Sequence, residues 1–156
     1  LLLFFPIAVF TQSWNTTLIG NLDYTQSLND IWGYQASNGK EYALVGLTNG
    51  TSIVDVTTDP YNPSEVAFIP GSNSTWRDIK TWDHYMYVGT EANDGIQVVN
   101  IEDPENAELV YTWTGVSNSH NIHIHDGYLY IVGASGDYIH ILDLAKPAMI
   151  WMGAER

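Results

Sequence analysis

The feature that most constrains the fold of this chain is an internal repeat with a period of 43 to 44 residues. Each unit opens on an Asx-Ile pair, reaches a glycine after β-branched or aromatic residues, and then passes through an apolar segment to a proline. The glycines Gly46, Gly89 and Gly133 are 43 and 44 residues apart. The other landmarks keep one order: Asp30-Ile31, Asp78-Ile79 and Asn121-Ile122; Val54-Asp55-Val56, Val99-Asn100-Ile101 and Leu142-Asp143-Leu144; Pro60, Pro104 and Pro147.

Within each unit, the pattern is that of four short strands separated by turn dipeptides. Asn49-Gly50, Asp94-Gly95 and Asp126-Gly127 are favoured in tight hairpins, because a type I′ turn needs positive φ at both central residues. The expected strands are 30–35, 41–48, 51–57 and 64–69 in the first unit, 77–82, 85–91, 96–102 and 108–114 in the second, and 121–125, 128–134, 138–144 and 148–152 in the third.

Four antiparallel strands repeated at this period are typical of a propeller blade. The sequence therefore predicts an all-β fold, a β-propeller fragment of about three four-stranded antiparallel blades, at 30–75, 76–119 and 120–156. A closed propeller needs at least about four blades, so we expect the set to be incomplete at the C-terminal end. A three-sheet solenoid or a β-sandwich is the alternative.

The first residues form an apolar run, Leu1–Phe10, followed by the small residues Thr11 and Ser13. This run has the length of a signal-peptide core and is too short to span a bilayer. We therefore interpret residues 1–13 as the remainder of a signal peptide and 14–29 as an entry segment. A buried N-terminal strand is the alternative interpretation.

Charge narrows the class of partner. The formal net charge is −13 and cysteine is absent. A surface with this much negative charge repels phosphate backbones. We therefore predict no nucleic-acid partner. Excess carboxylate suits cations, and it also keeps a secreted protein soluble.

Several motifs resemble a known family. Ile53-Val54-Asp55-Val56 and Ile141-Leu142-Asp143-Leu144, each followed by a proline, resemble LVIVD-repeat proteins. Asp30-Ile31-Trp32-Gly33-Tyr34, Trp76-Arg77-Asp78-Ile79-Lys80 and Ser119-His120-Asn121-Ile122 are similar to the choice-of-anchor B group within them. The resemblance covers nearly all of residues 15–153. It implies a bacterial β-propeller that is secreted or held at the cell surface, and it implies no catalytic residue.

Polar residues recur where successive blades would join. Such loops gather at one mouth of a propeller channel, and pockets form where loops converge. We therefore predict that Arg77, Asp78, His120, Asn121 and His123 converge in one polar pocket. The alternative is that the short Asx side chains hydrogen-bond neighbouring backbone. The ligand-binding candidates are Asp30, Arg77, Asp78, Glu91, His120 and Asn121.

His123 and His125 lie two residues apart on an expected strand, so both side chains project from one face. Such a pair can share a metal ion if a third ligand, such as Asp78, Glu91 or Asp137, comes close. We expect the polar pocket to exist, but we do not expect its side chains to have the geometry of a metal site. No cofactor is predicted, and a divalent metal at His123 and His125 is the alternative.

Tryptophans recur near the expected strand ends, among them Trp32, Trp76, Trp82 and Trp113. Packing between blades is the simpler interpretation, because large rings bury the most area, and stacking on carbohydrate is the alternative.

These observations favour a non-enzymatic secreted or cell-surface repeat protein that binds a protein or glycan partner. One competing hypothesis is a metal-dependent enzyme at the channel mouth, around His120, His123 and His125. The other is a structural module that carries further domains.

Overall fold

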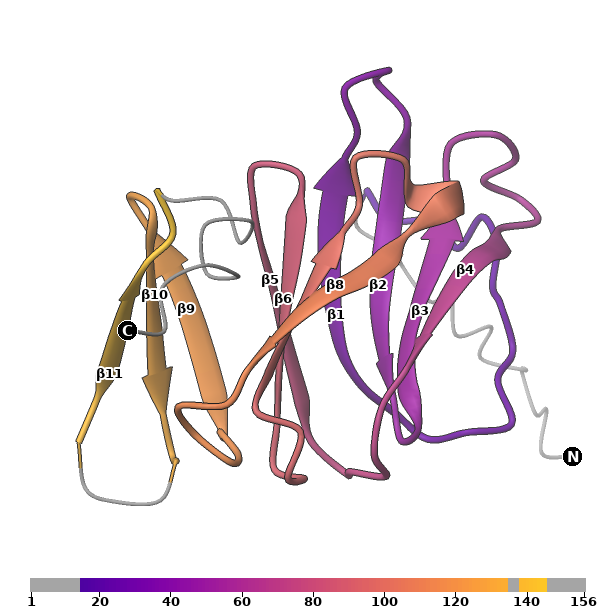
Figure 1. Ribbon diagram of the computed structural model, residues 1–156. Helices are drawn as coiled ribbons and strands as arrows, with labels where there is room; N and C mark the ends of the chain where they lie inside the picture. The colour runs from indigo at the N-terminus through magenta and orange to yellow at the C-terminus, as the bar shows by residue number, and fades with distance from the viewer. Residues whose placement is uncertain (1–14, 135–137, 146–156) are drawn as a thin grey trace, which may run out of the picture.

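The computed structural model describes residues 15–134 and 138–145, and in this part the chain is built from antiparallel sheets (Figure 1). Sheet 1 contains β1 (Leu28–Gln35), β2 (Glu41–Leu47), β3 (Gly50–Asp55) and β4 (Ser64–Pro70). Sheet 2 contains β5 (Arg77–Trp82), β6 (Tyr85–Thr90), β7 (Ile96–Asn100) and β8 (Glu108–Trp113). Sheet 3 contains β9 (Asn121–His125), β10 (Tyr128–Val132) and β11 (His140–Asp143).

The predicted all-β class and the three successive antiparallel sheets are confirmed. The helical element of the described residues is a single 3-10 turn, η1 (Pro104–Asn106), between β7 and β8. In the same part of the chain, no helix is long and apolar enough to cross a membrane. The expected fourth strand of sheet 3, at 148–152, and the expected signal segment, at 1–13, lie outside the described residues.

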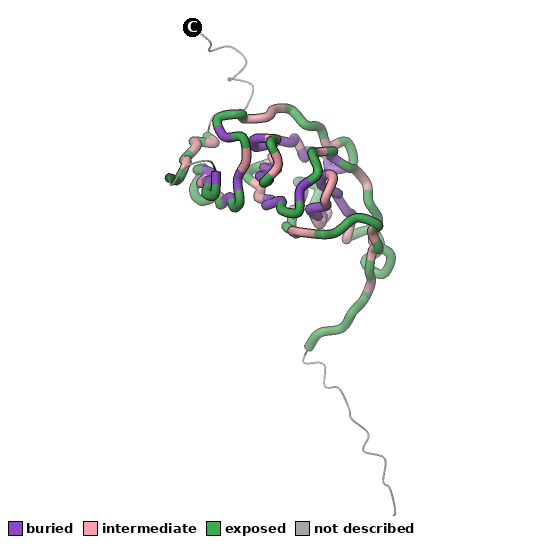
Figure 2. The backbone as a smooth tube through the Cα atoms, turned by 90° about the horizontal axis from the view of Figure 1, so that it is seen from below, coloured by how far each residue is buried: buried purple, intermediate pink, exposed green. Residues whose placement is uncertain are grey.

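The sheets lie side by side in chain order, with their first strands β1, β5 and β9 adjacent (Figure 1). We call the face that a sheet turns towards the next sheet its leading face, and the opposite one its trailing face. One core fills the space between sheets 1 and 2 and includes Leu44, Ile53, Ile79 and Val88. A second fills the space between sheets 2 and 3 and includes Tyr87, Val98, Ile122, Leu129 and Ile131. In Figure 2 the buried stretches lie in the interior of the folded part of the chain, and the exposed stretches run around its outside.

Neighbouring sheets are joined by the same hydrogen bond at both interfaces. The carboxylate of Asp30 on β1 accepts from the backbone N–H of Ile79 on β5, at 2.7 Å. The carboxylate of Asp78 on β5 accepts from the backbone N–H of Ile122 on β9, also at 2.7 Å, and from Asn121 Nδ2 at 3.2 Å. Each carboxylate therefore supplies a partner to a first-strand amide of the next sheet.

Glycine allows this close approach. Gly46 and Gly89 pair with Asp30 and Asp78 across the first hairpin of each sheet. A Cβ at Gly46 would lie 3.3 Å from Arg77 Cβ, and one at Gly89 would lie 3.0 Å from Ile122 Cγ2. In sheet 3 the residue opposite Asn121 is Val132, so Gly133, the third glycine of the repeat, stands one residue later.

The same type of turn follows the third strand of each sheet. Asp55, Asn100 and Asp143 each accept, through a side-chain oxygen, from the backbone N–H two residues further on. Asp55 accepts in addition from the N–H and the hydroxyl of Thr58, at 2.8 and 2.6 Å. This Asx turn redirects the chain at the same point of each unit, which explains why the repeat keeps an Asx residue there.

We predict that Asp78→Ala lowers the free energy of unfolding by about 1–3 kcal/mol, because it leaves the buried N–H of Ile122 without an acceptor. Asp78→Asn keeps an oxygen at this position and should cost less. Urea denaturation measures both. Glu108→Ala, which removes an exposed carboxylate on β8, is the control and should change stability by less than about 0.5 kcal/mol. Equal losses in Asp78→Ala and the control would contradict the bridging role.

A second prediction concerns acid stability. Hydrogen bonds from Thr58, from the Thr57 N–H and from Lys40 hold the pKa of Asp55 well below its usual range. Because this pKa is depressed in the folded state, the stabilisation is complete above the ordinary carboxyl pKa of about 4 and is lost as the pH falls below it. Asp55→Asn should therefore flatten the acid limb of a plot of urea midpoint against pH. Glu108→Gln should leave that limb unchanged, and an unaltered limb in Asp55→Asn would refute the assignment.

Candidate functional site

The structure distributes the predicted site residues over four places instead of one pocket. Strand alternation is the physical reason, because successive residues of β5 and β9 point to opposite faces of their sheets. Asp78 and Asn121 project from leading faces. Arg77 and His120, one residue earlier, lie on the opposite side, towards the preceding sheet. The prediction that Arg77, Asp78, His120, Asn121 and His123 converge in a single pocket is therefore wrong.

Asp30 and Asp78 accept hydrogen bonds from backbone N–H groups, as the alternative for the Asx side chains expected, whereas Asn121 bonds to a side chain. Asp30 and Asp78 make the inter-sheet bonds described above, and Asn121 donates to Asp78. Lys80 completes this group, since its ammonium contacts Asp78 and lies 4.6 Å from the ring centroid of Trp32. The sequence patterns did not single out Lys80, although its place two residues after Asp78 on one strand face is a signal for such a pair.

Arg77 is almost completely buried between sheets 1 and 2. Its Nε donates to the backbone oxygen of Leu47 at 2.7 Å, and its NH2 group donates to the oxygens of Ser72 and Thr48 at 2.5 and 3.4 Å. Burial lowers the pKa of Arg77, while the nearby charge of Asp94 raises it. The guanidinium thus joins the β2–β3 turn to the β4–β5 loop and is not available to a ligand.

Glu91 and His120 are the predicted site residues that meet on the surface. His120 Nδ1 lies 2.7 Å from Glu91 Oε1, and both side chains are about half exposed. The imidazole stacks on Trp76, with ring centroids 4.8 Å apart and an interplanar angle of 12°. The three residues come from loops that follow β4, β6 and β8. We call this group the Trp76–Glu91–His120 site.

The loops around this site are tied to one another. Ser72 donates to Asp94 through its N–H at 2.7 Å and its hydroxyl at 2.5 Å. The N–H of Gly95 donates to Ser117 O at 2.9 Å. A hollow of about 450 Å³ lies next to these contacts, and most of the residues that line it have polar side chains: Asn93, Asp94, Gly95, Gln97, Thr112, Thr114, Val116 and Ser117. This edge of sheet 2 thus offers hydroxyl, amide and carboxylate groups to solvent.

His123 and His125 lie on the leading face of β9, away from His120. Their rings are nearly parallel, at 14°, with centroids 6.5 Å apart, and His125 Nε2 lies 3.2 Å from Asp126. Among residues 15–134 and 138–145, no group of three or more His, Cys, Asp or Glu side chains is placed to hold a metal ion. Asp137, one of the third ligands expected for an ion at His123 and His125, lies outside the described residues.

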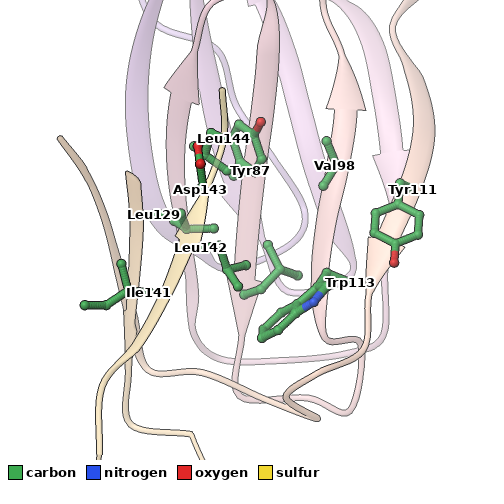
Figure 3. A pocket seen from close by; sticks show the side chains of 10 residues that line it. Tyr87, Val98, Tyr111, Trp113, Leu129, Ile141, Leu142, Asp143 and Leu144 are labelled. Atoms are coloured by element: carbon green, nitrogen blue, oxygen red, sulfur yellow. The ribbon is translucent and has the colours of Figure 1, made fainter. Parts of the chain in front are cut away.

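An apolar cavity of about 270 Å³ lies between sheets 2 and 3 (Figure 3). Trp113 and Tyr111 line it from β8, and Leu129 and Leu142 line it from sheet 3. Burial raises the pKa of Tyr87, which also lines the cavity, to about 12, so this phenol stays neutral at physiological pH. None of the predicted site residues lines the cavity.

We predict that Arg77→Met destabilises the protein by about 2–4 kcal/mol, because backbone oxygens of Leu47, Ser72 and Thr48 lose their donor. Hydrogen exchange should also speed up in residues 71–76, which lead to Trp76. Lys40→Met removes a partly exposed cation that pairs with Asp55 and Glu105, and it should cost less than about 1 kcal/mol. Urea denaturation with hydrogen–deuterium exchange tests both, and an Arg77→Met variant as stable as Lys40→Met would contradict the prediction.

Comparison of the chain with protein-family models, with curated proteins and with solved structures finds no match in any of the three. The function is therefore inferred from the residues described above.

Proposed function

We propose that the chain is a non-enzymatic binding module of a secreted or cell-surface β-propeller protein, and that the Trp76–Glu91–His120 site contacts a protein or glycan partner. The observation that carries the proposal is the 2.7 Å pair of Glu91 and His120 stacked against Trp76. An exposed aromatic ring beside an acceptor and a titratable imidazole offers both apolar area and directional hydrogen bonds.

The backbone around these exposed side chains is held by hydrogen bonds. The N–H of Glu91 donates to Trp76 O at 3.4 Å, and the N–H of Ser119 donates to Thr90 O at 2.8 Å. The N–H of His120 donates to Val132 O at 3.0 Å. A preorganised surface loses little conformational entropy when a partner binds, which favours recognition.

The Trp76–Glu91–His120 site supports a catalytic function less well than a binding function. A Glu–His pair can activate a hydroxyl nucleophile, but Ser119, the hydroxyl next to His120 in the chain, is 1% exposed. The indole of Trp76 lies against one face of the imidazole and narrows access to it. Binding needs only the exposed edges of these groups.

The wider assignment rests on the repeat. Three sheets with one internal order, joined by one type of inter-sheet bond, are what successive propeller blades would present. The resemblance of the repeat to LVIVD proteins of the choice-of-anchor B kind supports export to the cell surface. The apolar run at Leu1–Phe10 supports it as well.

Binding to an oligosaccharide array and to a panel of purified cell-envelope proteins tests the proposal. Wild-type protein should bind at least one ligand, and Trp76→Ala combined with His120→Ala should weaken this binding about tenfold or more, as for a central aromatic contact. Tyr61→Ala removes an exposed aromatic ring from the β3–β4 connection and serves as the control. Equal binding by wild type and the double variant, or an equal loss in the control, would refute the site.

A further inference from the structure

We propose that the hollow of about 450 Å³ at the edge of sheet 2, which Asp94, Gln97 and Thr112 help to line, binds one neutral sugar residue of a glycan. We call it the Gln97 hollow. Its volume lies within the range of about 300–1,000 Å³ that is usual for ligand pockets. The inference rests on the proposed binding function and narrows its partner to a glycan. The hollow and the Trp76–Glu91–His120 site consist of different residues, so the two assignments can fail separately.

The side chain of Gln97 carries a buried oxygen that has no partner. Gln97 lies on β7 and faces sheet 1, because its neighbours Ile96 and Val98 pack in the core between sheets 2 and 3. The residue is 6% exposed. Its Nε2 donates to Pro70 O at 3.1 Å, whereas its Oε1 accepts from no donor among the described residues. An unpaired buried acceptor costs free energy, and a ligand hydroxyl that reaches Oε1 from the hollow would remove this cost.

The rest of the lining suits a ligand that is covered with hydroxyl groups. It offers a carboxylate, an amide and three hydroxyls: Asp94, Asn93, Thr112, Thr114 and Ser117. A sugar hydroxyl both donates and accepts, so one sugar ring can pair with all three kinds of group. Among the described residues that line the hollow, Val116 alone has an apolar side chain. A peptide would therefore find little apolar lining for the aromatic or aliphatic anchors on which protein partners depend.

Charge selects a neutral sugar over an anionic one. Asp94 is the one charged residue among the described residues that line the hollow, and the chain as a whole has a net charge of −13. Arg77, which interacts with the charge of Asp94, is 1% exposed and does not line the hollow. Uronic acids and phosphorylated or sulfated sugars would thus meet a negative potential without a cation to pair with.

The shape of the hollow is fixed before a ligand arrives. Ser72 donates twice to Asp94, and the N–H of Gly95 donates to Ser117 O at 2.9 Å. Gly95 has a φ of +64°, and a Cβ at this residue would contact the backbone oxygen of Trp113. The β6–β7 turn therefore packs directly against the end of β8. A preformed hollow loses little conformational entropy on binding.

Titration of the whole chain with methyl glycosides tests the proposal. Saturation-transfer NMR measures affinity, and mapping of amide chemical shifts locates the ligand. The neutral probes are the methyl glycosides of glucose, galactose, mannose and N-acetylglucosamine, and methyl glucuronide is the anionic probe. At least one neutral glycoside should bind and should shift the amide signals of residues 93–97 and 112–117. Methyl glucuronide should leave these signals unchanged, because Asp94 repels its carboxylate.

A matched pair of variants tests the lining. Thr112→Val combined with Ser117→Ala removes two hydroxyls from the hollow without adding charge, and should weaken binding of the neutral glycoside about tenfold or more. Thr16→Val combined with Ser27→Ala removes the same groups from exposed positions of the entry segment, and should bind like wild type. Circular dichroism verifies that both variants keep the fold.

Trp76→Ala combined with His120→Ala separates the two assignments. Loss of glycoside binding in this variant alone would keep the proposed function and overturn the hollow as the sugar site. Loss in the hollow variant alone would support the hollow and refute the Trp76–Glu91–His120 site as a contact for that sugar, and loss in both variants would support both. A wild-type chain that binds no neutral glycoside, or equal binding by the wild type and the hollow variant, would also overturn the proposal.

Discussion

The arrangement of the three sheets depends on the bond between an aspartate carboxylate and the first-strand amide of the next sheet. Asp30 and Asp78 each supply an acceptor that no β-ladder could supply, because the N–H groups of Ile79 and Ile122 point away from their own hairpins. A buried amide without a partner costs free energy, so each bond sets both the spacing and the register of two sheets. The apolar cores then fill the space that these bonds define.

The same constraint places the candidate site. Once β5 and β9 are held in register by Asp78, strand alternation turns Arg77 and His120 towards the preceding sheet. Arg77 is buried there by the β4–β5 loop, whereas His120 reaches the surface beside Glu91 and Trp76. The same position of the repeat therefore holds a buried, hydrogen-bonded side chain in the second unit (Arg77) and an exposed side chain in the third (His120). This difference between units is where a repeat protein can acquire a specific surface.

Much of the fold was predictable from the sequence, because turn dipeptides and β-branched runs act locally. The strands expected at 77–82 and 121–125 agree with β5 and β9. The site was less predictable, because the assignment of Arg77 and Asp78 to one pocket ignored their opposite faces. The stacking of Trp76 on His120 joins residues 44 positions apart, and no local pattern signals it. The register of sheet 3 also departs from the repeat, since Val132 occupies the glycine position.

The order of strands within each sheet has a consequence for how the chain folds. Each of the strands β1–β11 pairs only with its neighbours in sequence, so each sheet can form from one contiguous segment. Contacts of this kind are associated with rapid folding among all-β proteins. The inter-sheet bonds of Asp30 and Asp78 span 49 and 44 residues, so docking closes much longer loops. The sheets are thus expected to form first and to assemble afterwards, and the slowest step would be sensitive to changes at Asp30 and Asp78.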